Sequence, residues 1–281
     1  MIRLARGDAR FPSLLKAIHD PPRGLFLRGD GGVEVLTRPA VAIVGARACS
    51  SYGSQVARML GRELAAAGLV VVSGMARGVD GEAHRGALDA GGVTVAVLGC
   101  GIDRDYPAAH AELARRIGER GLVVSEYEAG VEPAPWRFPA RNRIIAGLAA
   151  ATVLVEAREK SGALITADFA LEEGREVFAV PGEITSSLSV GPNRLLALGA
   201  TPLTAVEDVL RFCGLESPAA VPAPVEGPAA TLVEKVRQAP TTADELTRST
   251  AMEPAVVFAL LAELELSGLV SEADGLYRAW G

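Results

Sequence analysis

From Val41 to Ala179 the chain alternates short apolar runs with longer amphipathic stretches. The apolar runs are rich in β-branched residues and predict six strands: Val41–Gly45, Leu69–Ser73, Val93–Leu98, Leu122–Ser125, Ala151–Val155 and Glu176–Ala179. The Ala-rich stretches between them predict five helices: 51–67, 80–90, 108–120, 140–149 and 162–173. Continuous apolar strands separated by helices indicate a parallel sheet covered on both faces. The pattern therefore predicts a doubly wound α/β fold, in which ligands bind at the carboxyl ends of the strands.

The flanking segments differ from this pattern. Residues 1–40 are rich in Pro, Gly and Arg and predict an N-terminal extension with one short helix near Ser13–His19. The doubly wound domain is expected to cover residues 41–214. Residues 215–230, which include ESPAAVPAPVEGPAA, predict an extended Pro/Ala-rich linker.

Residues 231–281 predict a small second domain. A helix over 231–238 precedes a capped helix start at Thr241–Glu245 and a longer helix over 254–267. The segment LVSEADGLYRAW then predicts a strand pair with Asp274 and Gly275 in its turn. Three helices followed by a hairpin resemble a winged helix, a variant of the helix-turn-helix.

Composition narrows the functional classes. The 281 residues are 49% hydrophobic and carry a net charge of -6, so any nucleic-acid site must be a local basic patch. Cys49, Cys100 and Cys213 form no CxxC pair, which fits a reduced cytoplasm. The longest apolar stretch, near Ala146–Val155, is too short to cross a bilayer, and no signal peptide is expected.

Glycines follow the first three predicted strands. Gly45, Arg47 and Ser50 stand between the first strand and the next helix, where free N–H groups and the helix dipole favour a phosphate. Ser73, Gly74 and Arg77 follow the second strand, and Gly99 to Pro107 follow the third. Each turn alone fits an ordinary βα connection. Three in succession favour a surface that a ligand approaches closely.

The densest basic run is WRFPARNR at 136–143, which joins three arginines to two aromatic rings. Lys160, Ser161, Gly162 and Thr166 follow at the next helix start. From Trp136 to Gly162 there are five basic and two acidic residues, a local balance of +3. Such a run can be a solvated face anchored by its Trp, but cations beside rings also suit single-stranded nucleic acid. In the context of the glycine turns we favour the second interpretation.

Several catalytic patterns are missing from the sequence. It contains no GxxxxGK[ST], no GxGxxG after the first strand, no GxSxG and no HExxH. The three histidines are scattered, and no metal site or other cofactor is expected.

Long blocks of the sequence resemble the DNA-processing protein A (DprA/Smf) family. They include VAIVGAR, SGMARGVDGEAH, TVAVLGCGIDRDYP, FPARNRIIAGLAAATVLVEA and SGALITADFALEEGREVFAVPGEI, in order over about residues 10–212. The resemblance implies an extended Rossmann-like fold and a homodimer that binds single-stranded DNA, with no catalytic residues. It further implies protection of incoming DNA and loading of RecA onto it during natural transformation.

The same resemblance assigns the site. The first glycine loop and FPxRNR imply contacts to phosphates and bases, and SGxLxTA implies N–H donors from a helix start. Together with the second glycine turn, the predicted DNA-binding residues are Gly45, Arg47, Ser50, Ser73, Gly74, Arg77, Phe138, Arg141, Asn142, Arg143, Lys160, Ser161, Gly162 and Thr166. Here Ala46 and His110 replace residues common in the family, without the loss of a charge.

Two other hypotheses stay open at this point. A LOG-like nucleotide phosphoribohydrolase uses a similar pocket with PGGxGTxxE, whereas this chain has EKSGALITADFALE, with Glu156 or Glu172 as the candidate carboxylate. Alternatively, residues 231–281 are the main DNA binder. Release of free base from AMP would indicate the enzyme, and loss of single-strand binding on deletion of 216–281 would indicate the winged helix.

Overall fold

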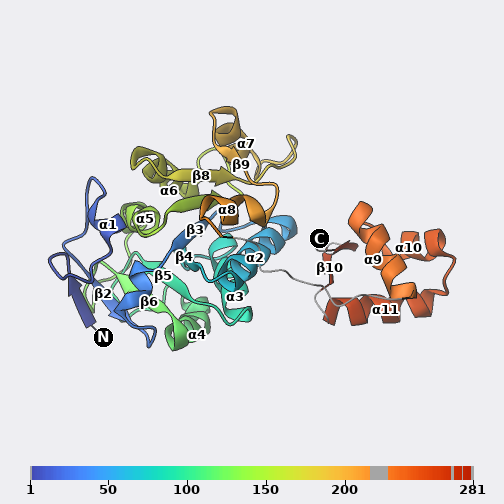
Figure 1. Cartoon of the computed structure of the whole chain (residues 1–281), viewed down its shortest axis with the longest axis horizontal. Coiled ribbons are helices and arrows are strands. Elements are labelled where there is room, and N and C mark those ends of the chain that lie inside the picture. The colour runs from blue at the N-terminus through green and yellow to red at the C-terminus, as the bar shows by residue number, and fades with distance from the viewer. Residues whose placement is uncertain (1, 216–226, 267–268, 274, 280–281) are drawn as a thin grey trace. The chain divides into compact units, whose positions relative to one another are not determined.

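The computed structural model describes residues 2–215, 227–266, 269–273 and 275–279. The chain divides into two compact units, Met1–Pro218 and Ala219–Gly281. Figure 1 shows the first unit from the blue N-terminus to the light-orange α8, and the deeper orange-to-red helices of the second unit.

The first unit is built on a nine-stranded sheet of order β1-β2-β6-β5-β4-β3-β7-β8-β9. The seven strands from β6 to β9 in this order are parallel, and β2 is antiparallel to both β1 and β6. The strands are β1 Ile2–Ala5, β2 Gly24–Arg28, β3 Ala40–Val44, β4 Val70–Ser73, β5 Thr94–Leu98, β6 Leu122–Ser125, β7 Ala151–Leu154, β8 Glu176–Ala179 and β9 Thr201–Pro202. The predicted doubly wound parallel sheet is confirmed, and its six strands are β3 to β8.

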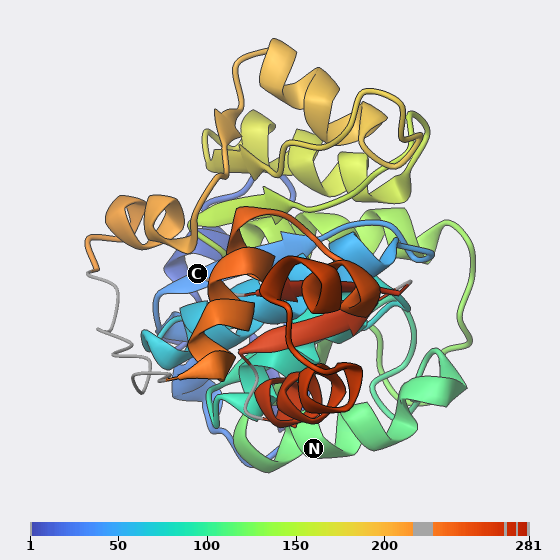
Figure 2. The same cartoon turned by 90° about the vertical axis from the view of Figure 1, so that its right-hand side faces the viewer.

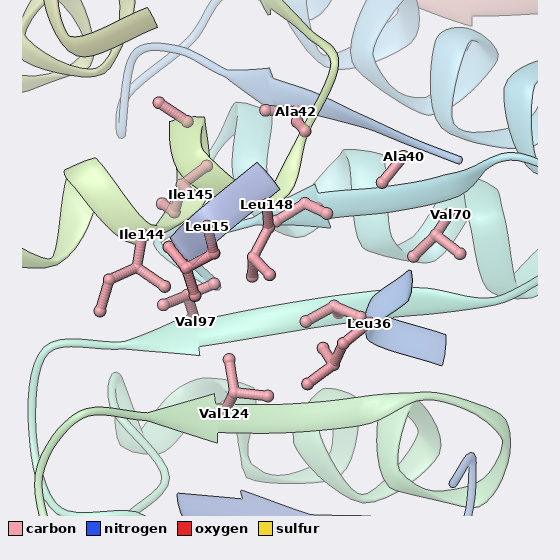
Figure 3. Packing of buried hydrophobic residues seen from close by; sticks show 14 of the residues in the cluster. Leu15, Leu36, Ala40, Ala42, Val70, Val97, Val124, Ile144, Ile145 and Leu148 are labelled. Atoms are coloured by element: carbon pink, nitrogen blue, oxygen red, sulfur yellow. The ribbon is translucent and has the colours of Figure 1, made fainter. Parts of the chain in front are cut away.

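Helices cover both faces of this sheet. Alternate residues of a strand point to opposite faces, so Ala42 and Val44 of β3 join one core cluster while Val41 and Ile43 join another. Helices α1 (Ser13–Lys16), α5 (Arg137–Leu148) and α6 (Gly162–Glu172) contribute to the first cluster. Figure 3 shows Ile144, Ile145 and Leu148 of α5 in this cluster, together with Leu15 of α1 and strand residues that include Val97 and Val124.

The opposite face is covered by α2 (Ser51–Ala66), α3 (Val79–Asp89), α4 (Ala111–Arg120) and α8 (Val206–Phe212). The remaining elements of the unit are α7 (Val190–Ala197) and the 3-10 helices η1 (Val33–Thr37) and η2 (Ala108–His110). Strand order reverses between β3 and β7, because β4 to β6 lie on one side of β3 and β7 to β9 on the other. Such a switch point opens a crevice at the carboxyl ends of the strands.

The N-terminal 40 residues contribute more than the one predicted helix. Strands β1 and β2 extend the sheet beyond β6, with Phe26 of β2 opposite Ser125 of β6. Leu4 of β1 and Leu25 and Leu27 of β2 are buried in the core. Arg3 interrupts the apolar residues of β1, and both strands lie in sequence rich in Pro, Gly and Arg, so the hydrophobic pattern did not mark them.

The second unit contains three helices and a hairpin, as the sequence predicts. They are α9 (Pro228–Gln238), α10 (Ala243–Thr250), α11 (Pro254–Leu266), β10 (Val270–Ala273) and β11 (Leu276–Ala279). Thr242 caps α10 by accepting the backbone N–H of Glu245 with its hydroxyl oxygen. The Glu245 carboxylate in turn accepts the backbone N–H of Thr242. The helices, orange to red in Figure 2, enclose their own core with Leu232, Leu246 and Leu261. The winged-helix prediction is confirmed.

Some parts of the predictions lie outside the described residues. They are most of the predicted linker, at 216–226, residue 267 of the predicted helix 254–267, and Asp274 and Trp280 of the predicted strand pair. Residues 228–230, which the linker prediction included, belong to α9. No helix in the described part of the chain is long and apolar enough to span a membrane.

Candidate functional site

A pocket of about 580 Å³ opens at the switch point of the sheet. The loops after β3 and β7 and the first turns of α5 and α6 form its walls. Nine of the predicted DNA-binding residues line it: Gly45, Arg47, Phe138, Arg141, Asn142, Lys160, Ser161, Gly162 and Thr166. The structure thus brings together residues up to 121 positions apart in sequence, from Gly45 to Thr166. We refer to this space as the switch-point pocket.

A second pocket, also of about 580 Å³, lies at the carboxyl ends of β4 and β5. Gly74 and Arg77 from the site prediction line this β4–β5 pocket, together with Gly99, Pro107 and Ala108. The two pockets adjoin, since they share six lining residues: Arg47, Ala48, Ala76, Tyr106, Phe138 and Arg141.

Phe138 stands where the two pockets meet. Its ring centroid lies 5.1 Å from that of Tyr106 at an interplanar angle of 30°, and the guanidinium carbon of Arg47 lies 5.5 Å from its centre. Gly99 permits this position, because an added Cβ there would be 2.8 Å from the Phe138 ring. Tyr106 was not among the predicted site residues. The glycine-rich end of the third strand was the signal that pointed to its loop.

Arg141 is buried and binds the carboxyl ends of β4 and β5. Its guanidinium donates to the carbonyl oxygens of Gly74, at 2.8 Å, and Val97, and its Nε–H donates to Asn142 Oδ1 at 3.2 Å. Burial lowers the pKa of Arg141 to about 10, which leaves the side chain charged at neutral pH. Arg141 therefore holds the loop after β4 against β5 while its edge faces both pockets.

Among the residues that the structure describes, Asp80 is the one acidic residue that lines the switch-point pocket. Its carboxylate accepts the backbone N–H groups of Gly74, at 3.1 Å, and Ala76, at 3.3 Å. Burial raises the pKa of Asp80, and the nearby positive charge of Arg141 opposes that shift. Asp80 thus orders the loop after β4 from one side, as Arg141 does from the other.

The start of α2 is already occupied by a carboxylate of the protein. Glu156, which follows β7 and is buried, accepts the backbone N–H of Ser50 at 2.9 Å and its hydroxyl at 2.5 Å. Gly53 leaves room for it, since an added Cβ would lie 2.3 Å from Glu156 Oε2. The sequence pattern predicts a phosphate at this helix start. The structure places an internal anion there instead, and both donor groups of Ser50 bind it.

Two other predicted residues point away from the pockets. Ser73 is wholly buried and donates to the Ile43 carbonyl at 2.6 Å, so its side chain links β4 to β3. Arg143 donates to both carboxylate oxygens of Glu126, at 2.8 and 2.9 Å, and forms a second salt bridge to Asp20 at 3.0 Å. The side chains of both residues are therefore engaged within the protein.

The start of α6 is arranged differently from that of α2. Ser161 caps the helix by accepting the N–H of Ala163, and an added Cβ at Gly162 would meet nothing within 4 Å. Asn142 donates to the Gly162 carbonyl at 3.1 Å and so ties α5 to this helix start. The backbone at Gly162 is consequently open to the switch-point pocket.

The lining is strongly basic. Arg47, Arg141, Arg158 and Lys160 line the switch-point pocket beside the single acidic Asp80, and Arg77 joins Arg47 and Arg141 in the β4–β5 pocket. Arg47, Arg77, Arg158 and Lys160 are exposed. No salt bridge within the described ranges engages any of these four side chains. They are available to an external anion.

Among the described residues, no three His, Cys, Asp or Glu side chains lie close enough together to bind a metal ion. The site is instead a pair of adjoining pockets with free cations at their rims and stacked rings between them. That arrangement suits a ligand with several negative charges and flat apolar groups.

Comparison with known proteins identifies the family. The family model described as DNA recombination-mediator protein A matches residues 3–214. The chain belongs to this family. A model described as the DprA winged helix domain matches residues 216–275 of the same chain. The resemblance found in the sequence blocks is thereby confirmed.

Relatives within the family are similar over most of the chain. The Streptococcus pneumoniae DNA processing protein DprA is 46% identical over 203 residues, which cover 72% of this chain and 71% of the relative. A putative DNA processing protein DprA of Mycobacterium tuberculosis is 42% identical over 266 residues, which cover 92% of this chain and 68% of the relative.

Two solved structures of this family share the fold. The Streptococcus pneumoniae protein superposes with a TM-score of 0.72 at 44% identity, over 75% of this chain and 73% of that one. The Helicobacter pylori protein, whose single-stranded DNA binding mode was described, gives a TM-score of 0.66 at 33% identity, over 72% of this chain and 92% of that one. Membership of the family and its Rossmann-like fold are thus established together.

Proposed function

We propose that this chain is a single-stranded DNA-binding protein that holds the strand along the carboxyl edge of its parallel sheet and does no covalent chemistry on it. The observation that carries the proposal is the junction of the two pockets, where Arg47 and Tyr106 lie against the Phe138 ring and exposed cations line the rims. Family membership supports it, as does the single-strand binding of the Helicobacter pylori relative.

Phosphates are the groups that the pocket rims would receive. Exposed guanidinium and ammonium groups neutralise phosphates and release their counterions. Arg47, Arg158 and Lys160 supply them in the switch-point pocket, and Arg77 in the β4–β5 pocket. The open backbone at Gly162 adds the positive end of α6. Gly45 and Gly74 leave room for the protein's own side chains, because an added Cβ would lie 2.6 Å from Val79 at Gly45 and 2.5 Å from the Arg141 guanidinium at Gly74.

Unpaired bases are the groups that the rings would receive. Phe138 and Tyr106 offer ring faces between the pockets, and base–ring stacking contributes about 1–3 kcal/mol per base. A duplex keeps its bases stacked inside, so rings that can stack on a base favour a single strand. Buried or internally bonded members of the predicted set act as supports in this proposal. They are Ser50, Ser73, Arg141, Asn142, Arg143 and Thr166.

The wider role extends the same proposal. We infer from the family that the protein works in the cytoplasm as a homodimer, protects incoming DNA and loads the RecA recombinase during natural transformation. Two sites on one dimer would engage one strand with an avidity that exceeds the affinity of either site alone.

The proposal is tested by the affinity for a fluorescent single-stranded oligonucleotide. Arg47→Ala removes a phosphate donor and the cation above Phe138, and is expected to weaken binding on the order of tenfold for every sequence tried. Arg211→Ala is the matched control, because Arg211 is exposed on α8 and does not line either pocket. Equal affinity of wild type and Arg47→Ala would contradict the assigned site.

The LOG-like nucleotide enzyme is the rival function. Its carboxylate would have to reach a bound nucleotide, but Glu156 binds Ser50 and Glu172 is exposed near the far end of α6. Incubation with AMP and other mononucleotides separates the two functions. We expect no free base, and turnover at ordinary enzyme rates would replace the binding function with the enzyme.

A further inference from the structure

Trp136 is an exposed ring at the edge of the site. Its side chain precedes α5 and is 62% exposed, and its neighbour Pro135 lines the switch-point pocket. The guanidinium carbon of Arg137 lies 4.8 Å from the centre of the Trp136 ring and 5.1 Å from that of Tyr127. We refer to Tyr127, Arg137 and Trp136 as the Trp136 shelf.

Hydrogen bonds within the protein fix Arg137 and Tyr127 of the shelf. Arg137 donates to the carbonyl of Glu132, and the backbone N–H of Tyr127 donates to Ser125 Oγ at 3.0 Å, directly after β6. Cation–π contacts orient the Trp136 ring on one side. Its large exposed fraction leaves the rest of the ring open to solvent. A ring fixed in this way loses little conformational freedom when a flat partner stacks on it.

The shelf continues the line of the two pockets. Along the sheet, the loops after β7 and β3 carry Lys160 and Arg47, and the loop after β6 carries Tyr127. Gly99 connects these features, since an added Cβ would lie 2.8 Å from the Phe138 ring and 3.3 Å from the Arg137 carbonyl. With strands about 4.8 Å apart, the five strands from β7 to β6 span roughly 19 Å. That length accommodates several nucleotides.

Charges near the shelf are balanced, unlike those in the pockets. Arg104 pairs with Glu132 at 2.6 Å, Arg143 pairs with Glu126, and Glu128 is exposed. Such a surface does not attract phosphates strongly. Its open feature is an aromatic face, so its natural partner is a base and not a phosphate.

We infer that Trp136 stacks on a nucleobase of the same single strand, beyond the pockets at the β6 end of the sheet. This inference rests on the proposed function, because the pockets must first hold the strand. Trp136 would then raise the affinity only for oligonucleotides long enough to reach it. Because it binds a base and not a phosphate, it would add little to the salt dependence of that affinity.

The test measures affinity for oligonucleotides of increasing length, from about three to about twelve nucleotides. Trp136→Ala is expected to lose about fivefold to a hundredfold in affinity for the long ones and to match wild type for the shortest. Trp136→Phe keeps a ring and should restore most of the affinity. The salt slope should stay that of wild type in both variants. Equal affinities of Trp136→Ala and wild type at every length would overturn the inference.

Fluorescence gives a second measurement on the folded protein. The chain has two tryptophans, Trp136 and Trp280, so Trp280→Phe leaves Trp136 as the single reporter. Stacking on a base is expected to quench its emission as a long oligonucleotide is added. An unchanged emission at saturation would contradict the inference.

The outcomes separate this inference from the proposed function. If Arg47→Ala weakens binding while Trp136→Ala does not, the shelf is not a contact and the pocket assignment stands. If wild type binds no single-stranded DNA at any length, the proposed function itself is wrong, and the inference is overturned with it.

Discussion

At the scale of single residues, the arginines of one short run have different tasks. Arg137, Arg141 and Arg143 stand within seven positions on the first turns of α5. Arg137 lies over two rings at the surface, Arg141 is buried with 5% exposure, and Arg143 is paired with Glu126 and Asp20. Only the tertiary fold distinguishes them, because Arg137 contacts Tyr127, Arg141 binds Gly74 and Arg143 binds Glu126, all from other parts of the chain.

Arg141 and Arg47 should therefore differ in their effect on stability. Arg141→Ala removes the donor to two carbonyl oxygens and a positive charge that favours the ionised form of the buried Asp80. We expect a loss on the order of 3 kcal/mol in the free energy of unfolding. Arg47→Ala, which removes an exposed cation, should change it by about 0.5 kcal/mol or less. Urea unfolding of the two variants checks this, and equal midpoints would contradict the buried role of Arg141.

The site could be predicted from sequence where residue type and local turn determine it. Arg47, Phe138 and Lys160 follow from a basic and aromatic composition at strand ends. The pairing of Arg143 with Asp20 could not be predicted, since these residues are 123 positions apart and meet only when the N-terminal segment packs beside α5. The contact of Glu156 with the start of α2 could not be predicted for the same reason. Glu156 is 106 positions from Ser50, and the two meet only because β7 pairs with β3.

At the scale of elements, a buried chain of hydrogen bonds joins α3 to two strands. Thr94 of β5 donates its hydroxyl to the Val71 carbonyl of β4 at 2.7 Å, so it can accept only from the Nδ1–H of His84 at 2.6 Å. His84 is wholly buried on α3. Burial, and then the positive groups of His110, Arg85 and Arg141, lower the pKa of His84 from 6.5 to about 3.

This link predicts a pH dependence of stability. In the unfolded chain His84 takes up a proton near pH 6.5, and in the folded protein only near pH 3. The contribution of neutral His84 to the free energy of unfolding is thus complete above about pH 6.5. It declines as the pH falls toward 3, by about 1.4 kcal/mol per pH unit. Over this window, the free energy of unfolding of His84→Gln should depend less steeply on pH than that of wild type. His19 is exposed, so His19→Gln should show the wild-type pH dependence. Identical pH profiles of His84→Gln and wild type would contradict the assignment.

The elements themselves followed from the hydrophobic pattern to different degrees. Strands β3 to β8 are central, buried on both faces and read as continuous apolar runs, so their prediction held. Strands β1, β2 and β9 lie toward the edges of the sheet, β9 has only two residues, and β1 has one buried residue among exposed ones. Their position depends on the sheet that they join, and a local pattern does not contain that information.

At the scale of the whole molecule, the protein is acidic and has a local basic surface. The net charge is -6, yet the two pockets are lined by five basic side chains and one acidic one. Local potential governs the binding of phosphates, and the total charge limits non-specific attachment to nucleic acid. The doubly wound topology produces this surface, because parallel strands bring all their carboxyl ends to one edge.

The salt dependence of single-strand affinity tests this claim most directly. Each phosphate contact that is lost should reduce the slope of log affinity against log salt concentration by about 0.7. We predict that reduction for Arg47→Ala and for Lys160→Ala, about 1.4 for the double variant, and the wild-type slope for Arg211→Ala. A double variant that keeps both the affinity and the slope of wild type would contradict the account.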